Sequence, residues 1–209
     1  LRSRHFRRLA EIHAIRRPNH PAYHQGQRRH PAGVVRQQVR LLVLAILQQV
    51  LDAAAPHGLA GLGGSAPSVG VVGFLTGAGI GPLVRTFGLS SDYVRSFELV
   101  TGAGELLRAT PEENAELFWG LRGGKSTLGI VTSVEIDLLP IAEFYGGAVY
   151  FDGADAGIVL REWAGWCADL PESVSTSIAL QQLPPMPGVP EPLAGRLTVA
   201  VLTNKIFVP

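Results

Sequence analysis

The sequence predicts an α+β fold, and three patterns along the chain support this prediction. Apolar residues recur at helical spacing in residues 41–55, and the stretch ends at Pro56 and Gly58. Residues 96–109 read as two strands joined by a Gly-Ala-Gly turn, which is the pattern of an antiparallel hairpin. From residue 144 onward, a strand, an amphipathic helix and two more strands follow one another. Helices and antiparallel strands are therefore expected together in this chain.

Residues 1–40 differ in composition from the rest of the chain. They hold ten arginines and one acid, a net charge of +9, whereas the remaining residues carry −8 and bring the 209-residue chain to +1. Three interpretations stay open: a basic arm that binds nucleic acid, an organellar transit peptide, and a disordered or aberrant segment. The last is favoured, because aromatic rings for base stacking are limited to Phe6 and Tyr23, and the serines typical of transit peptides to Ser3. A nucleic-acid partner is accordingly not expected.

Composition also limits metal sites and membrane insertion. Cys167 is the only cysteine, so neither an intrachain disulfide nor a cysteine cage for a metal can form. No pair of histidines combines H-x-x-x-H spacing with a flanking acid, and no metal site is expected. The longest aliphatic run, residues 41–47, is far shorter than the ~20 apolar residues of a membrane-spanning helix. No membrane association is expected, and the compartment stays open, with the cytoplasm favoured.

Residues 58–83 are rich in glycine and small apolar residues, a composition that favours close approach of the backbone to another backbone or to a ligand. Two nucleotide-binding motifs fail nearby. The stretch GLRGGKSTLGIVT contains Gly-Lys-Ser, but Trp119 stands where a Walker A loop needs its first glycine. In the fingerprint G-x-G-x-x-G, Pro82 takes the place of the third glycine. Neither an ATPase loop nor a Rossmann fingerprint is predicted.

Residues 110–140 are expected to form a short helix and a strand. Thr110 and Glu113 have the spacing of a capping box at the start of an acidic helix. Three neighbouring residues would supply the buried face of this helix, namely Leu117, Phe118 and Trp119. Residues 128–136 then alternate between apolar and polar side chains, which predicts a strand that ends by Pro140.

Residues 144–202 read as the start of a second domain. After a strand at 144–151, Asp152 can cap a helix. The apolar face of that helix would consist of Val159, Trp163, Trp166 and Leu170. Two further strands lie around 175–180 and 196–202. Because no closing helix or partner strand follows, this unit would have an unpaired edge, and we expect the chain to be truncated.

Four consecutive blocks, GSAPSVGVVGFLTGAGIG, GLSSDYVRSFELVTGAGELLRA, NAELFWGLRGG and LGIVTSVEIDLLP, resemble the FAD-linked oxidoreductases related to berberine bridge enzyme and vanillyl-alcohol oxidase. The resemblance covers residues 49–202. It implies the second half of a p-cresol-methylhydroxylase-type FAD-binding domain in residues 41–140, followed by the start of an antiparallel-sheet substrate domain in residues 141–209.

By the same resemblance, FAD is the expected cofactor and a small molecule is the expected substrate. In the family, the first block surrounds the diphosphate and the ring edge of the flavin with backbone amides. This implies eight cofactor-binding positions: Gly64, Ser65, Ser68, Val69, Gly70, Gly73, Ile130 and Val131. The flavin would accept a hydride from a C–H bond of an alcohol, an amine or a sugar. No catalytic base is assigned to the candidates Glu143, Tyr145 and Tyr150, because a strand tyrosine is more often a packed aromatic than a catalyst.

Departures from the family bear on how FAD is held. Residues 1–48 contain nothing like the family's upstream glycine-rich loop, whose histidine often carries the flavin, and Ala66 stands where some members have a tethering cysteine. His57 is better placed to cap a helix end. FAD is therefore expected to be non-covalent and weakly held, in a fragment of impaired activity. The glycines that would shape the turn and the strand entry beside it are Gly123, Gly124 and Gly129. The alternative function is a non-catalytic remnant or a basic-armed interaction module, and the oligomeric state is not predicted.

Overall fold

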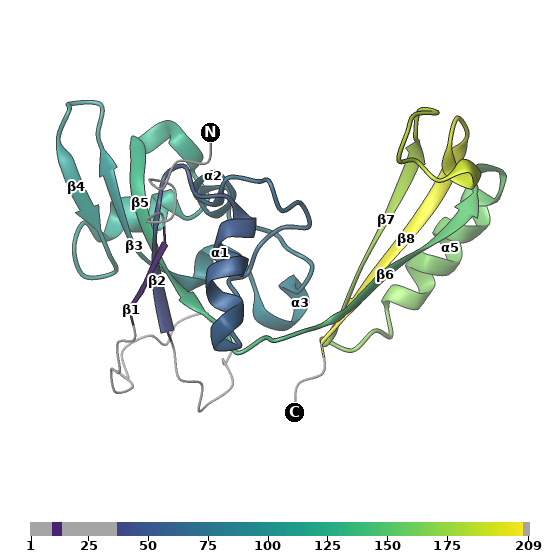
Figure 1. Ribbon diagram of the computed structural model, residues 1–209, viewed down its shortest axis with the longest axis horizontal. Helices are drawn as coiled ribbons and strands as arrows, with labels where there is room; N and C mark the ends of the chain where they lie inside the picture. The colour runs from purple at the N-terminus through teal and green to yellow at the C-terminus, as the bar shows by residue number, and fades with distance from the viewer. Residues whose placement is uncertain (1–9, 14–36, 207–209) are drawn as a thin grey trace. The chain divides into compact units, whose positions relative to one another are not determined.

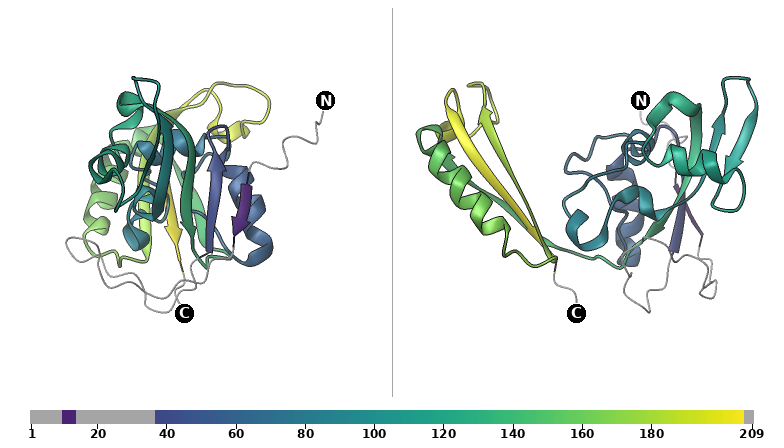
Figure 2. Two further views of the ribbon diagram at one scale, coloured as in Figure 1. Left: turned by 90° about the vertical axis from the view of Figure 1, so that its left-hand side faces the viewer. Right: turned by 180° about the vertical axis from the view of Figure 1, so that it is seen from behind.

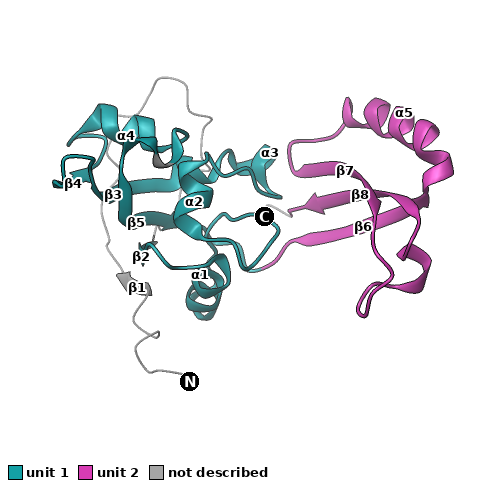
Figure 3. Cartoon of the chain, turned by 90° about the horizontal axis from the view of Figure 1, so that it is seen from above, with its two compact units in different colours: residues 1–142 teal, residues 143–209 magenta. Residues whose placement is uncertain are grey.

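The computed structural model describes residues 10–13 and 37–206, and Figure 1 draws the other residues as a thin grey trace. Most of the basic segment, and with it the three interpretations of that segment, lies outside the described residues. The chain divides into two compact units, Leu1–Ala142 (unit 1) and Glu143–Pro209 (unit 2), which Figure 3 colours separately.

Unit 1 is built on an antiparallel five-stranded sheet with the strand order β1-β2-β5-β3-β4. Its strands are β1 Ala10–His13, β2 Gln37–Leu42, β3 Val94–Val100, β4 Leu106–Ala109 and β5 Ile130–Leu138. The predicted hairpin is present, since β3 and β4 pair from Phe97 with Ala109 to Val100 with Leu106. The strand predicted after the third block is also present as β5, two residues further along the chain.

The helix predicted over residues 41–55 is partly wrong. Leu41 and Leu42 close strand β2, and helix α1 covers only Leu47–Ala54. Leu41 pairs with Val134 of β5 and is fully buried. A continuous apolar run suits a buried strand as well as a buried helix, and local periodicity cannot separate the two. The pairing with β5 decides the outcome.

One face of this sheet carries the core of unit 1. Apolar side chains of β5 alternate toward it, and helices α1 and α2 (Val71–Thr76) lie against the same face (Figures 1 and 2). The rings of Phe97 on β3 and Phe118 on α4 (Ala115–Leu121) approach with centroids 6.0 Å apart. The α+β fold class predicted from the sequence is confirmed by this arrangement.

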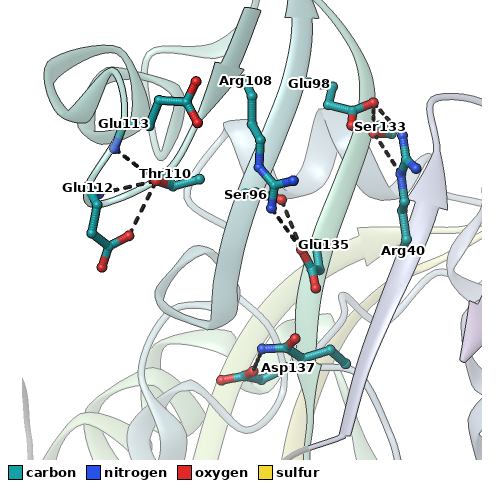
Figure 4. Close-up of polar contacts among 11 residues, drawn as sticks. Arg40, Ser96, Glu98, Arg108, Thr110, Glu112, Glu113, Ser133, Glu135 and Asp137 are labelled. Carbon is teal, nitrogen blue, oxygen red and sulfur yellow. Dashed lines mark hydrogen bonds and ion pairs between the residues drawn. The ribbon is translucent and has the colours of Figure 1, made fainter. Parts of the chain in front are cut away.

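The opposite face carries a network of polar side chains, shown in Figure 4. Ser133 donates a hydrogen bond of 2.9 Å to Glu98, which also pairs with Arg40. On the same strands, Arg95 forms an ion pair with the buried carboxylate of Asp137. Burial acts to lower the pKa of Arg95, but the hydrogen bond and charge of Asp137, together with nearby glutamates, outweigh it and raise that pKa. Arg95 is therefore held in its charged form.

Helix α4 differs from its prediction at both the start and the buried face. The Thr110 hydroxyl accepts hydrogen bonds from the N–H groups of Glu112 (3.1 Å) and Glu113 (2.9 Å), but the helix begins only after Asn114, which has φ 52°. Phe118 is buried as predicted, whereas Trp119 is 73% exposed. Adjacent helical residues point about 100° apart, so packing Phe118 on the sheet turns Trp119 away from it.

Unit 2 has the predicted order of a strand, a helix and two strands. Its elements are β6 Tyr145–Asp152, α5 Ala156–Cys167, β7 Val174–Gln182 and β8 Leu197–Lys205, with the antiparallel strand order β6-β8-β7. The Asp152 side chain accepts a hydrogen bond of 3.0 Å from Ala154, within a 3-10 turn just before α5. The indole N–H of Trp163 donates to Thr176 Oγ1 at 3.1 Å and ties α5 to the sheet.

Within residues 10–13 and 37–206, no helix has both the length and the apolar character needed to cross a bilayer.

Candidate functional site

The glycine-rich segment of residues 58–83 contains glycines with two different roles. A Cβ on Gly81 would stand 2.2 Å from the carbonyl oxygen of Gly63, so the segment contacts itself backbone to backbone. Gly79 has φ +74°, and its Cβ would stand 2.8 Å from Cβ of Ser90. Only glycine fits such contacts. Tight packing of the loop therefore explains these positions without any ligand.

Gly70 and Gly73 do not follow this explanation. Both are exposed, and no atom lies within 4 Å of the position that a Cβ would take at either residue. Gly70 precedes helix α2, and Gly73 lies in its first turn. Exposed glycines that pack against nothing leave an open backbone surface, which is the feature that a backbone-binding ligand requires.

Backbone donors on this surface are free. The N–H groups of Gly64, Ser65, Ser68, Gly70 and Gly73 donate to no acceptor among the residues that the structure describes. By contrast, Val69 N–H donates to Ala66 O at 3.3 Å and Val71 N–H to Ala45 O at 2.9 Å. The predicted positions thus supply five unused donors within one short segment. Such a run of N–H groups suits an oxygen-rich anion.

Ile130 and Val131, the other two predicted positions, begin strand β5. Gly129 precedes them with φ +145°, and a Cβ there would stand 2.6 Å from Val100 O, so glycine is required at this strand entry. The Ile130 side chain is 70% exposed and that of Val131 is buried. The register with β2 stops at Ser133, so both residues lie beyond it and pair only with β3 in the described part of the chain.

Helix α2 connects the two groups of predicted positions. It contacts β5 and also η4 (Lys125–Leu128), the 3-10 turn just before Gly129. The structure therefore brings Gly73 to the same region of unit 1 as the start of β5.

The turn at Gly123 and Gly124 has a structural role that agrees with the failed Walker A match. A Cβ on Gly124 would stand 2.6 Å from Gly120 O, which makes glycine necessary for leaving helix α4. Gly123 has open space around it. A Walker A loop joins a strand to a helix, whereas here helix α4 precedes the turn and strand β5 follows.

Sequence reasoning missed a cleft of about 500 Å³ beside this turn. Arg122 contributes to it, with its guanidinium 4.8 Å from the centre of the Phe118 ring and its buried Nε without a hydrogen-bond partner in the described structure. Three separate segments form the cleft, and its lining is Leu89, Ser91, Asp92, Trp119, Gly120, Arg122, Gly123, Gly124, Thr127 and Leu128. In the sequence, only the Arg-Gly-Gly stretch could have indicated this cleft, and so short a pattern is a weak indication.

The three candidates for a catalytic base lie in unit 2. Glu143 precedes β6, whereas Tyr145 and Tyr150 lie within it, five residues apart. Side chains an odd number of positions apart in a strand point to opposite faces. The two tyrosines therefore belong to different faces of the sheet, and none of the three residues is assigned as a base. Among the described residues, no group of three or more histidine, cysteine or acidic side chains could hold a metal ion.

Comparison with known proteins finds a domain match that includes the glycine-rich segment. Residues 36–110 match the family model of an FAD binding domain. An FAD-linked oxidoreductase of Gibberella zeae is 40% identical over 119 residues, which make up 56% of this chain and 21% of that protein. The chain spans about a fifth of the length of the curated relatives it matches.

Solved structures show the same relation. A crystal structure of 6-hydroxy-D-nicotine oxidase from Arthrobacter nicotinovorans matches with a TM-score of 0.67 and 26% identity, over 82% of this chain and 36% of that one. A BBE-like protein of Physcomitrella patens gives a TM-score of 0.68 at 19% identity over 82% of this chain and 35% of that one, a likeness of fold alone. Residues 36–110 thus match part of an FAD binding domain, and the chain is similar in sequence to FAD-linked oxidoreductases and in fold to 6-hydroxy-D-nicotine oxidase and a BBE-like protein.

Proposed function

We propose that this chain binds FAD on the glycine-rich surface of unit 1 and belongs to an enzyme that oxidises a C–H bond of an alcohol, an amine or a sugar. The run of free N–H donors at Gly64, Ser65, Ser68, Gly70 and Gly73 carries this proposal. A diphosphate presents oxygens that such donors can bind. At two of the five positions, Gly70 and Gly73, glycine leaves open the space in which a side chain would block the diphosphate.

The residues present fit FAD on this surface. The five donor residues and Val69 would hold the diphosphate and the ring edge, while the main chain of Ile130 and Val131 would complete the contact at the start of β5. When bound, FAD supplies a ring system that accepts a hydride. The protein's part is to orient the cofactor and to shield it from water.

Domain roles follow from this assignment. Residues 41–140 would form a partial FAD-binding domain, and residues 141–209 the start of a substrate domain. The substrate of the enzyme to which this chain belongs would be a small molecule.

A charge placed on the open surface tests the proposal. Gly73→Asp adds a carboxylate in the first turn of α2, where a negative charge is compatible with the helix. We expect FAD binding, followed by the change in visible flavin absorbance, to weaken roughly tenfold or more, because the carboxylate repels the diphosphate. Gly157→Asp, in the first turn of α5 in unit 2, is the matched control and should bind FAD like the wild type. Equal binding by both variants would contradict this location.

The mode of attachment has its own test. Ala66 offers no thiol, and His57 lies in the short 3-10 turn of residues 55–57 that follows α1. FAD should therefore be non-covalent, and acid precipitation of the loaded protein should leave the yellow colour in the supernatant. Colour that stays in the pellet would refute non-covalent binding.

The charge of +9 in residues 1–40 favours the second candidate function, a basic-armed interaction module. Arginine contacts with phosphates are strongest at low ionic strength. Absence of duplex DNA binding under such conditions, measured by filter binding, would exclude its nucleic-acid version.

A further inference from the structure

The glycine-rich surface of unit 1 lacks charge of its own. Residues 58–83 contain no lysine, arginine, aspartate or glutamate. The diphosphate of FAD is an anion, and backbone N–H groups offset its charge only in part. A cation contributed by another segment would complete the site.

Lys125 contacts the C-terminal end of helix α2, whose first turn contains Gly73. Its Cε and Nζ lie 3.3 Å and 3.6 Å from the position that a Cβ would take on Gly77, at the C-terminal end of α2. The carbonyl oxygen of Gly73 lies 3.4 Å from the same position. The lysine side chain thus extends from η4 onto α2, the helix that carries one of the five free donors.

The backbone at Lys125 adopts a conformation that glycine would take more easily. Its φ is +57°, in the left-handed region that side chains with a Cβ disfavour. Strained positions of this kind often occur at functional sites. No ion pair joins the exposed Lys125 to any residue that the structure describes. Its charge is therefore available to a ligand.

We propose that Lys125 supplies the positive charge that holds the diphosphate of FAD on the glycine-rich surface. This inference rests on the proposed function, because it assumes that FAD binds there. Lys125 is a binding residue for the cofactor and takes no part in the chemistry of the substrate. The competing role is purely structural, since an ammonium group near the C-terminal end of a helix also stabilises the exposed carbonyls there.

Three variants and two ligands separate these roles. Lys125→Gln removes the charge, Lys125→Gly removes the charge and relieves the backbone at φ +57°, and Lys125→Arg keeps the charge. The dissociation constants of FAD and riboflavin, which lacks phosphate, are measured by quenching of flavin fluorescence at low and high salt. Arg161→Gln, an exposed substitution on α5, is the control.

At low salt we expect the glutamine and glycine variants to bind FAD about two- to fivefold more weakly than the wild type, the range of an exposed charge pair. The arginine variant and the control should match the wild type. High salt should remove the difference, because it screens exposed charges. Riboflavin should bind all five proteins equally.

Each other outcome overturns the inference in a recognisable way. Wild-type affinity for FAD in both Lys125→Gln and Lys125→Gly would show that the lysine is not a ligand. If only Lys125→Gln then had a lower melting temperature, the lysine would have the structural role of stabilising the helix end. An equal loss for FAD and riboflavin would place its effect away from the diphosphate. If the wild type binds FAD and the variants do also, only this inference fails; if the wild type binds no FAD, the proposed function fails with it.

Discussion

Unit 1 and unit 2 use their apolar residues in different ways. The cluster of mutually packed buried residues lies entirely in unit 1, where helices cover one face of the sheet. In unit 2, helix α5 has no buried residue, and its sheet leaves Val149 and Leu180 more than half exposed. Three strands and one helix bury too little surface to build a comparable interior. Unit 1 is therefore expected to resist local unfolding better than unit 2.

The largest expected contrast comes from removing one phenylalanine in each unit. Phe97 is fully buried and contacts Phe118, whereas Phe151 on β6 is 39% exposed. Phe97→Ala should reduce the free energy of unfolding by about 3–5 kcal/mol, because it leaves a cavity in a packed core, and Phe151→Ala by about 1 kcal/mol. Urea denaturation monitored by circular dichroism measures both. Similar losses would show that unit 2 has an equally well-packed core.

Glycine substitutions should change stability in opposite directions in the two units. Gly81→Ala places a Cβ 2.2 Å from Gly63 O, and the resulting backbone shift should cost about 2 kcal/mol. Gly165→Ala in the exposed part of α5 meets no atom within 4 Å and should stabilise the helix by about 0.5–1 kcal/mol. Thermal unfolding of each variant gives the sign directly. A neutral Gly81→Ala would mean that the glycine-rich segment is not packed as described.

The smallest contrast concerns two ion pairs. Arg95→Ala removes the ion pair between Arg95 and the carboxylate of Asp137, which is 2% exposed, and should cost about 1–2 kcal/mol after allowance for the partly exposed arginine. Arg196→Ala breaks a pair with Asp152 in which both side chains are more than half exposed, and should cost less than about 0.5 kcal/mol. Denaturant midpoints compare the two. Equal losses of stability in the two variants would show that the buried pair contributes no more than the exposed pair.

The same pair has a defined pH dependence. Folding raises the pKa of Arg95, so its contribution is complete below the unfolded pKa of the guanidinium and is lost only as the pH rises through the higher folded value. The stability difference between wild type and Arg95→Ala should therefore not decline between neutral and mildly alkaline pH. A decline there would mean that another group controls this interaction.

Local sequence patterns were enough to predict those strands and helices whose characteristic residues lie close together in the sequence. The Gly-Ala-Gly turn between two β-prone runs defined the hairpin of β3 and β4, and the order of β6, α5, β7 and β8 followed from alternation and helical spacing. The cofactor positions were also named from sequence, although from a family resemblance. Their placement as cofactor contacts stays a prediction.

Tertiary structure decided the features that depend on distant partners. Leu41 is part of a strand because β5 pairs with it, and Trp119 is exposed because Phe118 takes the side of α4 that faces the sheet. The glycines of residues 58–83 look alike in sequence, but Gly81 packs against Gly63 while Gly70 and Gly73 face open space. The sequence determined which segments can form strands, helices and turns, because those preferences are local. Only the folded chain decided which donors remain free and which side chains surround the cleft, because both depend on contacts between residues far apart in sequence.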